Sequence, residues 1–387
     1  MEAVKTFVAE SKDTVELVMN AFEFGAEMAA SVAGDIFPIV SLVGPLVQLA
    51  LDNVESREAA FMREQFQKVK NNLERASEGV QRINEEVTKA NKDIQLFPIE
   101  TKIKHQFRRY MLFLDDNSDY NKNEFLQYFD TSGGKNPLKD LYSIVVGTPP
   151  FGKPLLNAIL SYKEKSRRPV EEYCTQLKYL FCLGITTLLA HDVMAGSAKE
   201  KKHLEKWRKR MTTVQENIDA AVEECIVSFP IQAKTDCHRL VRDQEGVTNQ
   251  QLADALIEML KRKYDWVGWS VRVCKSHYSI FSSKKKCNCP TGQSRFKVTT
   301  ADEKLNIWVS YSAHLKPVDK KLVQEFIQSQ KKPTAENIAE HLLEKLQGYY
   351  MVHTVKSCKY LACSWSFTDD RHYWEKHKNL HVCVHSF

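Results

Sequence analysis

A run of apolar residues between Ala59 and Ile94 constrains the fold of this chain more than any other feature of its sequence. The apolar positions alternate at spacings of three and four, and charged or amide residues fill the positions between them. This is the period of a long helix with a coiled-coil seam, which at 1.5 Å per residue spans roughly 50 Å. Pro98 ends the run, because proline cannot donate to the helical hydrogen-bond ladder. The seam consists of Ala59, Met62, Phe66, Val69, Leu73, Ala76, Val80, Ile83, Val87, Ala90 and Ile94.

A second seam runs through a predicted helix at Lys199–Ser228, which Phe229-Pro230 closes. Two long heptad helices separated by shorter ones predict an elongated bundle in which they lie side by side. An intermolecular coiled coil is the alternative, in which the Ala59–Ile94 seam contacts a protein partner or a second copy of the chain. The second seam consists of Leu204, Trp207, Met211, Val214, Ile218, Ala221 and Cys225.

Shorter helices are expected at 99–114, 153–165 and 170–195, where apolar residues recur at helical spacing. A polar loop with the sequence DDNSDYNKN follows the first of them. Residues 1–230 are therefore predicted to form a bundle of long helices, and residues 231–387 a separate, smaller domain.

The second domain contains an internal repeat. The segment TNQQLADALIEMLKRKYDWV, which begins at Thr248, aligns without gaps with TAENIAEHLLEKLQGYYMVH, which begins at Thr334. Each copy reads as a helix followed by a strand, so a duplicated helix–strand unit is predicted. Further strands are expected at 295–300, 305–311, 360–367 and 380–384, which makes this an α+β domain and the whole chain an α+β protein.

The basic charge of the chain is confined to its C-terminal part. Residues 231–387 carry 25 Lys and Arg against 16 Asp and Glu, whereas the chain as a whole has a net charge of only +6. Such asymmetry favours an anionic partner for the second domain, although a solvated surface accounts for it equally. The exposed candidate is the loop triplet Lys284, Lys285 and Lys286. No nucleic-acid-binding motif accompanies it, so we rank membrane headgroups above DNA or RNA.

A second basic cluster, Lys199–Arg210, contains seven Lys or Arg and two Glu. It is interpreted as the solvated side of the long helix, with Leu204 and Trp207 facing inward.

The longest uncharged apolar stretch, Ile36–Leu51, is the candidate for membrane insertion. It is 16 residues long, shorter than the roughly 20 residues that cross a bilayer, and Pro38, Gly44 and Pro45 interrupt it. We therefore expect a soluble resting state. The acidic N-terminus has no signal-peptide pattern, which predicts a cytoplasmic protein with mostly reduced cysteines. The inserting residues would be Ile36, Phe37, Ile39, Val40, Leu42, Val43, Leu46, Val47 and Leu49.

Three motifs resemble known sites but lack a residue that the chemistry needs. Gly147–Lys153 has phosphate-loop spacing and follows the segment YSIVV, which is expected to be a strand, yet prolines replace two backbone donors and the hydroxyl residue. Asp115, Asn117 and Asp119 open like a calcium loop, but Tyr120 and Leu126 occupy the Gly and Glu positions. The dipeptide His191-Asp192 alone does not define a metal-dependent phosphohydrolase. No catalytic residue and no enzymatic activity are expected.

A zinc site is the remaining site hypothesis. On a strand, His381, Cys383 and His385 would share one face, and imidazole with thiolate suits zinc. Their spacing matches no known zinc finger or knuckle, and alternation on an ordinary sheet face is the alternative. Apart from this site, no cofactor is expected.

Three passages together resemble a known family. They are FPIVSLVGPLVQLAL with the heptad run after it, then IKHQFRRYMLFL, then FGKPLLNAILSYKEKSRRPVEEYCTQLKYLFCLGITTLLAHDVMAG. In this order they are similar to the rapunzel proteins and the related cephalotoxin-like proteins over Phe37–Gly196, and more loosely over the next helix. The resemblance implies a helical, non-enzymatic protein. It associates the rapunzel branch with fin and skeletal development and the cephalotoxin branch with toxicity.

Two hypotheses of function remain. The first is a cytoplasmic scaffold or interaction protein of the rapunzel type, acting in skeletal or fin development. The alternative is a membrane-active protein similar in layout to α-helical pore-forming toxins, in which the bundle hides Ile36–Leu51 until this stretch enters an anionic bilayer. Fold analogy alone does not establish function, and apolar segments of this length are more often core.

Overall fold

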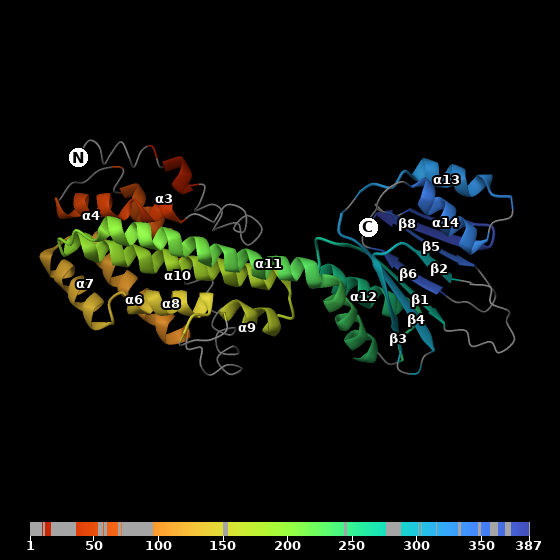
Figure 1. The fold of residues 1–387 in the computed structure, drawn as a ribbon, viewed down its shortest axis with the longest axis horizontal. Helices are drawn as coiled ribbons and strands as arrows, with labels where there is room; N and C mark the ends of the chain where they lie inside the picture. The colour runs from red at the N-terminus through yellow and green to blue at the C-terminus, as the bar shows by residue number, and fades with distance from the viewer. Residues whose placement is uncertain are drawn as a thin grey trace. The chain divides into compact units, whose positions relative to one another are not determined.

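The computed structural model describes residues 10, 12–16, 36–52, 57, 60–68, 71, 96–149, 154–243, 246–275, 288–300, 302, 304–314, 316–331, 334–346, 350–356, 363–367 and 373–386. The chain divides into two compact units, Met1–Val227 and Ser228–Phe387 (Figure 1). The expected division at 230/231 lies three residues beyond this boundary. The α+β class is confirmed, with long helices first and a mixed unit second.

Within the described residues of the first unit, all regular structure is helical. Two helices were not expected from the sequence: α7 occupies most of the predicted polar loop, and α8 contains the β-branched segment YSIVV, read as a strand. Ser118 caps α7, and Gly147 ends α8 in the left-handed conformation. The helices are α3 (Phe37–Val40), α4 (Val43–Leu51), α6 (Leu96–Asp115), α7 (Asp119–Thr131), α8 (Asn136–Val146), α9 (Leu155–Tyr162), α10 (Arg167–Met194) and the first part of α11 (Glu200–Asp243).

Helix α10 forms the centre of this unit. It packs against α3, α4, α6, α7 and α8, and most of its side chains are buried. A helix with apolar side chains on every side is stable only when it is enclosed, because no face of it is wholly polar. Helix α8 approaches it closely at Gly184, where a Cβ would collide with the side chain of Leu138.

The predicted heptad seam contributes to the core of its own chain where the structure describes it. Met62 and Phe66 are fully buried, and the Phe66 ring packs against the rings of Phe107 and Tyr110 on α6. These two seam residues are therefore not available for an intermolecular coiled coil. The other positions of the Ala59–Ile94 seam lie outside the described residues.

Helix α11 does not end where the sequence predicts. It passes through Pro230 and continues to Asp243, so the expected closure at Phe229-Pro230 is wrong. An interior proline removes one hydrogen bond and costs about 3 kcal/mol. Phe229 offsets this cost, because its ring packs among four aromatic rings of the second unit, Tyr264, Trp266, Trp269 and Tyr311.

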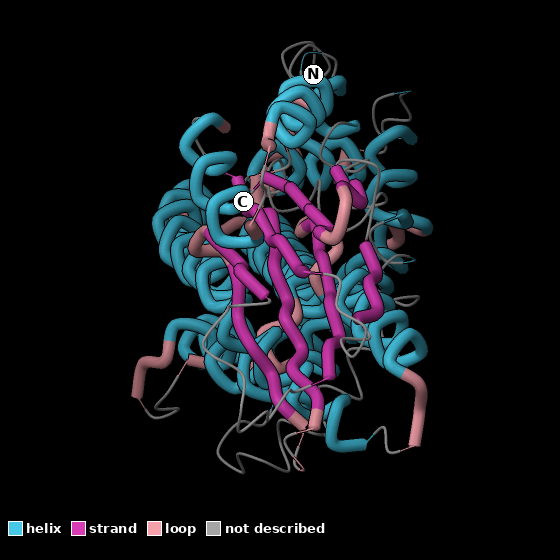
Figure 2. Tube along the Cα trace, turned by 90° about the vertical axis from the view of Figure 1, so that its right-hand side faces the viewer, coloured by secondary structure: helices cyan, strands magenta, loops and turns pink. Residues whose placement is uncertain are grey.

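Among its described residues, the second unit contains two four-stranded antiparallel sheets. Figure 2 shows the strands in magenta. The strand orders of the two sheets are β3-β4-β1-β6 and β2-β5-β8-β7. Its elements are the end of α11, α12 (Asn249–Lys263), β1 (Gly268–Lys275), β2 (Asn288–Thr291), β3 (Arg295–Thr299), β4 (Leu305–Ser312), α13 (Lys320–Ser329), α14 (Ala335–Lys345), β5 (Tyr350–Lys356), β6 (Cys363–Phe367), β7 (Tyr373–His377) and β8 (Leu380–Ser386).

The predicted duplication is confirmed and extends further than the sequence indicated. The first half contains the end of α11, α12 and β1 to β4; the second contains α13, α14 and β5 to β8. Thr248 and Thr334 cap equivalent helices. When β1 to β4 are matched in order with β5 to β8, strands β3, β4 and β1 correspond to β7, β8 and β5, and both sets follow the same order in their sheets. The fourth strand of each sheet comes from the other half: β6 joins the first sheet and β2 joins the second. Each half therefore contributes one strand to the sheet of the other.

Because of this exchange, one edge strand of each sheet comes from the other half. Strand β6 pairs with β1 from Ser270 to Cys274, and β2 pairs with β5 from Val352 to Val355. Helix α12 packs on β1 and β6, and α14 packs on β5 and β2. Neither half can complete its sheet alone, so the two are expected to unfold together.

We expect Leu342→Ala to destabilise both halves equally. Leu342 is fully buried on α14, and its truncation costs about 2–5 kcal/mol. Because the halves exchange strands, amide hydrogen exchange should speed up by the same factor in β1 and β4 as in β5 and β8. Glu340→Ala, on the exposed side of the same helix, is the matched control. Unchanged protection of β1 and β4 would show that the halves unfold separately.

Candidate functional site

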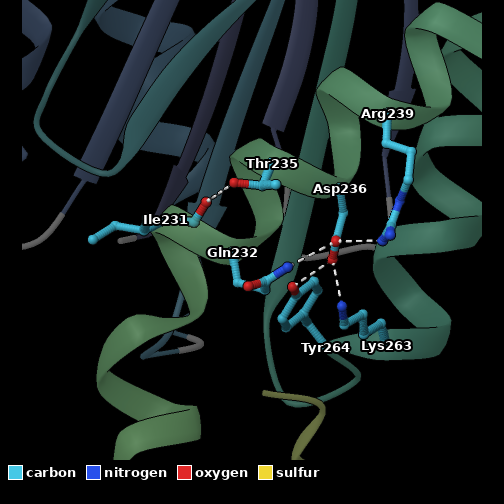
Figure 3. Close-up of polar contacts among 7 residues, drawn as sticks. All are labelled: Ile231, Gln232, Thr235, Asp236, Arg239, Lys263 and Tyr264. Atoms are coloured by element: carbon cyan, nitrogen blue, oxygen red, sulfur yellow. Dashed lines mark hydrogen bonds and ion pairs between the residues drawn. The ribbon is translucent and has the colours of Figure 1, made fainter. Parts of the chain in front are cut away.

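Asp236, a buried charged residue of the second unit, lies on α11 and is 3% exposed. Its carboxylate accepts hydrogen bonds from Gln232 Nε2 and Arg239 Nη2, both at 3.0 Å (Figure 3). It also accepts from Lys263 Nζ and Tyr264 Oη, both at 2.7 Å. We call these five residues the Asp236 hub.

The Asp236 hub joins two helices. Gln232, Asp236 and Arg239 lie on consecutive turns of α11, whereas Lys263 and Tyr264 form the C-terminal end of α12. A carboxylate at a helix C-terminus is unfavourable for the helix dipole, and the Lys263 ammonium compensates for it. The four donors account for the lone pairs of the carboxylate, so the hub holds α11 against α12. No sequence pattern predicted it, because the hub joins two helices, and Asp236 and Lys263 are 27 residues apart.

All nine membrane-insertion candidates are buried. They lie on α3 and α4 or at the ends of these helices, and both helices pack against α10. Helix α11 covers them as well: the Arg208 guanidinium lies 4.9 Å from the Phe37 ring, and the Glu200 carboxylate lies against Gly44, where a side chain would collide with it. The apolar stretch is therefore part of the bundle core.

One helix among the described residues is long and apolar enough to cross a membrane, and it is α10. Of its most apolar 18-residue window, 89% is buried inside the bundle, as is usual for the core helix of a soluble protein. This length is not visible in the sequence when only uncharged runs are counted, because Lys178 interrupts α10. A search that tolerated one charge would have found it.

The dipeptide His191-Asp192 does not form a joint site, because its two side chains contact different partners. His191 stacks on Phe129, and its Nε2 lies 3.3 Å from a carboxylate oxygen of Asp130 on α7. Asp192 is buried and lies 2.5 Å from His203 Nδ1 on α11. Burial raises the pKa of the neighbouring Glu200, and the charge of Asp192 raises it further. The His191 contacts join the C-terminal end of α10 to α7, and the Asp192 contact joins it to the first turn of α11.

The three zinc candidates lie on one face of β8, as predicted. His385 Nε2 lies 2.7 Å from Ser310 Oγ on β4, so this face meets the other sheet. Burial raises the pKa of Cys383 to about 11, which keeps the thiol protonated, whereas zinc binds the thiolate. Burial also lowers the pKa of His381, and Lys376 and Arg272 lower it further. Among the described residues, no three His, Cys, Asp or Glu side chains could hold a metal ion together. The zinc site stays a prediction.

The cysteines differ in state. Cys274 is disulfide-bonded and is thus an exception to the expectation that the cysteines are mostly reduced. The free and buried thiols are those of Cys174, Cys182, Cys225, Cys237 and Cys383.

The other candidate motifs have structural roles or lie outside the described part of the chain. Asn117 donates to the Ala50 carbonyl oxygen at 2.8 Å and thereby ties the α6–α7 loop to the end of α4. The triplet Lys284, Lys285 and Lys286 falls outside the described residues, as do Gly152 and Lys153 of the phosphate-loop pattern. The cluster Lys199–Arg210 lies at the start of α11, with Trp207 buried as expected.

We expect Asp236→Ala to reduce the free energy of unfolding by about 3–5 kcal/mol, because it removes the acceptor that the half-buried ammonium of Lys263 and the buried hydroxyl of Tyr264 share. Urea unfolding followed by tryptophan fluorescence measures this change. Asp243→Ala is the control on the same helix, where an exposed site should change stability by less than about 0.5 kcal/mol. If the two substitutions change the free energy of unfolding equally, the Asp236 hub does not stabilise the fold.

Comparison with known proteins assigns the helical part of the chain. The cephalotoxin-like middle helical domain matches residues 53–246, half of the chain, and its match ends three residues after α11. Protein rapunzel of Danio rerio is 26% identical over 200 residues, which cover 51% of this chain and 88% of the relative. No solved structure matches the chain. On the strength of the matched helical domain, the chain belongs to the cephalotoxin-like family, to which the rapunzel protein is related.

Proposed function

We propose that this protein is a non-enzymatic interaction protein of the rapunzel type, which acts in the cytoplasm by binding partners. The observation that carries the proposal is the structural use of its buried charged groups. Asp236 accepts four hydrogen bonds, Glu171 accepts from Arg167 Nε at 2.8 Å, and Asp192 is held by His203. Groups of the types that enzymes use as acids and bases are thus used here to hold helices together.

The architecture supports a protein with two functional parts. The match to the rapunzel protein covers most of that relative, but only about half of this chain. The second unit, with its duplicated sheets, is thus a further surface on which a partner can bind. The association of the rapunzel branch with fin and skeletal development makes that the process we propose.

The proposal predicts partners whose recovery depends on the folded protein. After chemical crosslinking in cells, tagged wild-type protein should retain specific proteins in near-stoichiometric amounts. Asp236→Ala should reduce this recovery together with the folded fraction, whereas Asp243→Ala should leave it unchanged. If no protein is enriched above a tag-only control, the interaction role is wrong.

The second candidate is a membrane-active protein, and the packing of α10 with α3 and α4 favours it. One helix of bilayer-spanning length and one apolar helical pair lie together in the same core. A bundle that opened would release both at once, and burial of their apolar surface in a bilayer would drive insertion. This state requires the loss of the present core, so it would occur only after a trigger.

Dye release from vesicles tests the second candidate. Wild-type protein should release dye from vesicles that contain anionic lipid, and Val43→Asp or Leu46→Asp should abolish the release, because a charge on the apolar face of α4 opposes the burial of that face in a bilayer. Both residues are buried, so circular dichroism has to establish that each variant is folded. Gln48→Asp adds the same charge at the exposed position of α4 and is the control. If wild-type protein releases no dye at either low or high salt, the second candidate is excluded.

A further inference from the structure

Two rows of basic side chains lie on neighbouring helices of the first unit. On α8, Lys135 and Lys139 are one helical turn apart, at the N-cap and in the first turn. On α11, Lys202, Lys206 and Arg210 are spaced by one turn each. Residues four apart in a helix lie on the same face, so every member of each row points to the same side. We call these five residues the basic rows.

Aromatic contacts hold the two rows together. The rings of Tyr142 on α8 and Trp207 on α11 meet edge to face, with their centroids 6.2 Å apart. The Arg210 guanidinium lies over both rings, at 4.7 Å from the Tyr142 centroid and 4.8 Å from that of Trp207. Such contacts restrict the guanidinium and hold it at the junction of the two helices. Arg210 is therefore held in place before any ligand binds.

The positive charges of the basic rows are close enough to repel one another. The charge of Arg210 lowers the pKa of Lys206 most, followed by slight burial and then by the charges of Lys139, Lys135 and Lys202. Lys206 thus senses all four other members of the rows. Like charges at this density cost free energy in the folded protein, and an anion that bridges the rows would relieve the repulsion.

We propose that the basic rows form a binding site for a compact ligand with several phosphate groups. The site is distinct from Lys284–Lys286 and from the apolar helices, and it does not depend on the proposed function. Phosphate fits both residue types: the Arg210 fork can hold two oxygens of one phosphate, and each lysine supplies a mobile point charge. A soluble inositol polyphosphate and the headgroup of a phosphorylated inositol lipid share this chemistry.

The size of the site favours such a ligand over nucleic acid. Lys202 and Arg210 are eight residues apart, which corresponds to about 12 Å along the helix, and Lys135 and Lys139 are about 6 Å apart. This area matches one ring that carries several phosphates. A DNA duplex presents its phosphates over a helical repeat of about 34 Å and would leave most of them without a partner here.

Direct binding of inositol hexakisphosphate to the full-length protein tests the proposal by titration calorimetry at low salt. We expect Lys202→Glu/Lys206→Glu to weaken binding at least tenfold. The matched control is Lys201→Glu/Lys209→Glu, with the same charge change on the adjacent exposed side of α11. The control should keep wild-type affinity, and both variants should keep the wild-type melting temperature.

Two further arms identify the source of the ligand. Binding to phosphatidylcholine vesicles with phosphatidylinositol bisphosphate, lost in Lys202→Glu/Lys206→Glu, would assign the site to a lipid headgroup. Binding of the soluble probe alone would assign it to a free polyphosphate. The proposal is overturned if the probe does not bind, if the control variant loses as much affinity as the test variant, or if a 20-base-pair duplex binds more tightly than the probe through the same residues.

Discussion

The structure depends on one continuous apolar seam along α11. Trp207, Met211, Val214, Ile218, Ala221 and Cys225 are buried in the core of the first unit, and Phe229, Ala233, Cys237 and Val241 in a core of the second. A single helix thus supplies part of the core of each unit, and neither core is complete without it. This explains why the chain tolerates Pro230 within the helix: Phe229 and Ala233, on either side of the proline, are anchored by burial, and the Asp236 hub follows within two turns. It also explains why the matched family domain extends past Val227 to the end of α11.

The parts of the fold that could be predicted are those in which the signal is local. The period of α10 and α11 and the repeat from Thr248 and Thr334 are readable, because each depends on residues within a few turns. The YSIVV segment of α8 was misread because β-branched residues favour strands, whereas burial of Ile144 and Val145 in a helical core outweighs that preference. The strand exchange could not be predicted, because it pairs β6 with β1 and β2 with β5 across a long stretch of chain.

The candidate sites follow the same rule. Sequence reasoning placed the three residues of β8 on one face, since alternation along a strand determines its faces. It did not find the Asp236 hub or the basic rows, because each joins two helices that are distant in sequence. In the rows, Lys135 and Lys206 are brought together by the contact of Tyr142 with Trp207, and no local pattern contains that contact. Charge counted along the chain points to the C-terminal part, whereas the basic rows lie on two helices of the first unit.

The polar groups of α10 distinguish the two candidate functions. Glu171, Lys178 and Asp192 are buried, and in the bundle Arg167 donates to Glu171 while His203 holds Asp192. Burial lowers the pKa of Lys178, although the neighbouring Asp219 on α11 favours its charged form. In a bilayer, each charged group at the centre of a helix costs about 2.5–3.5 kcal/mol on insertion scales. Helix α10 is therefore better suited to the bundle, where its charges have partners, than to the isolated spanning state that its length would permit. The charges that make α10 a stable core helix are the reason to place interaction before insertion.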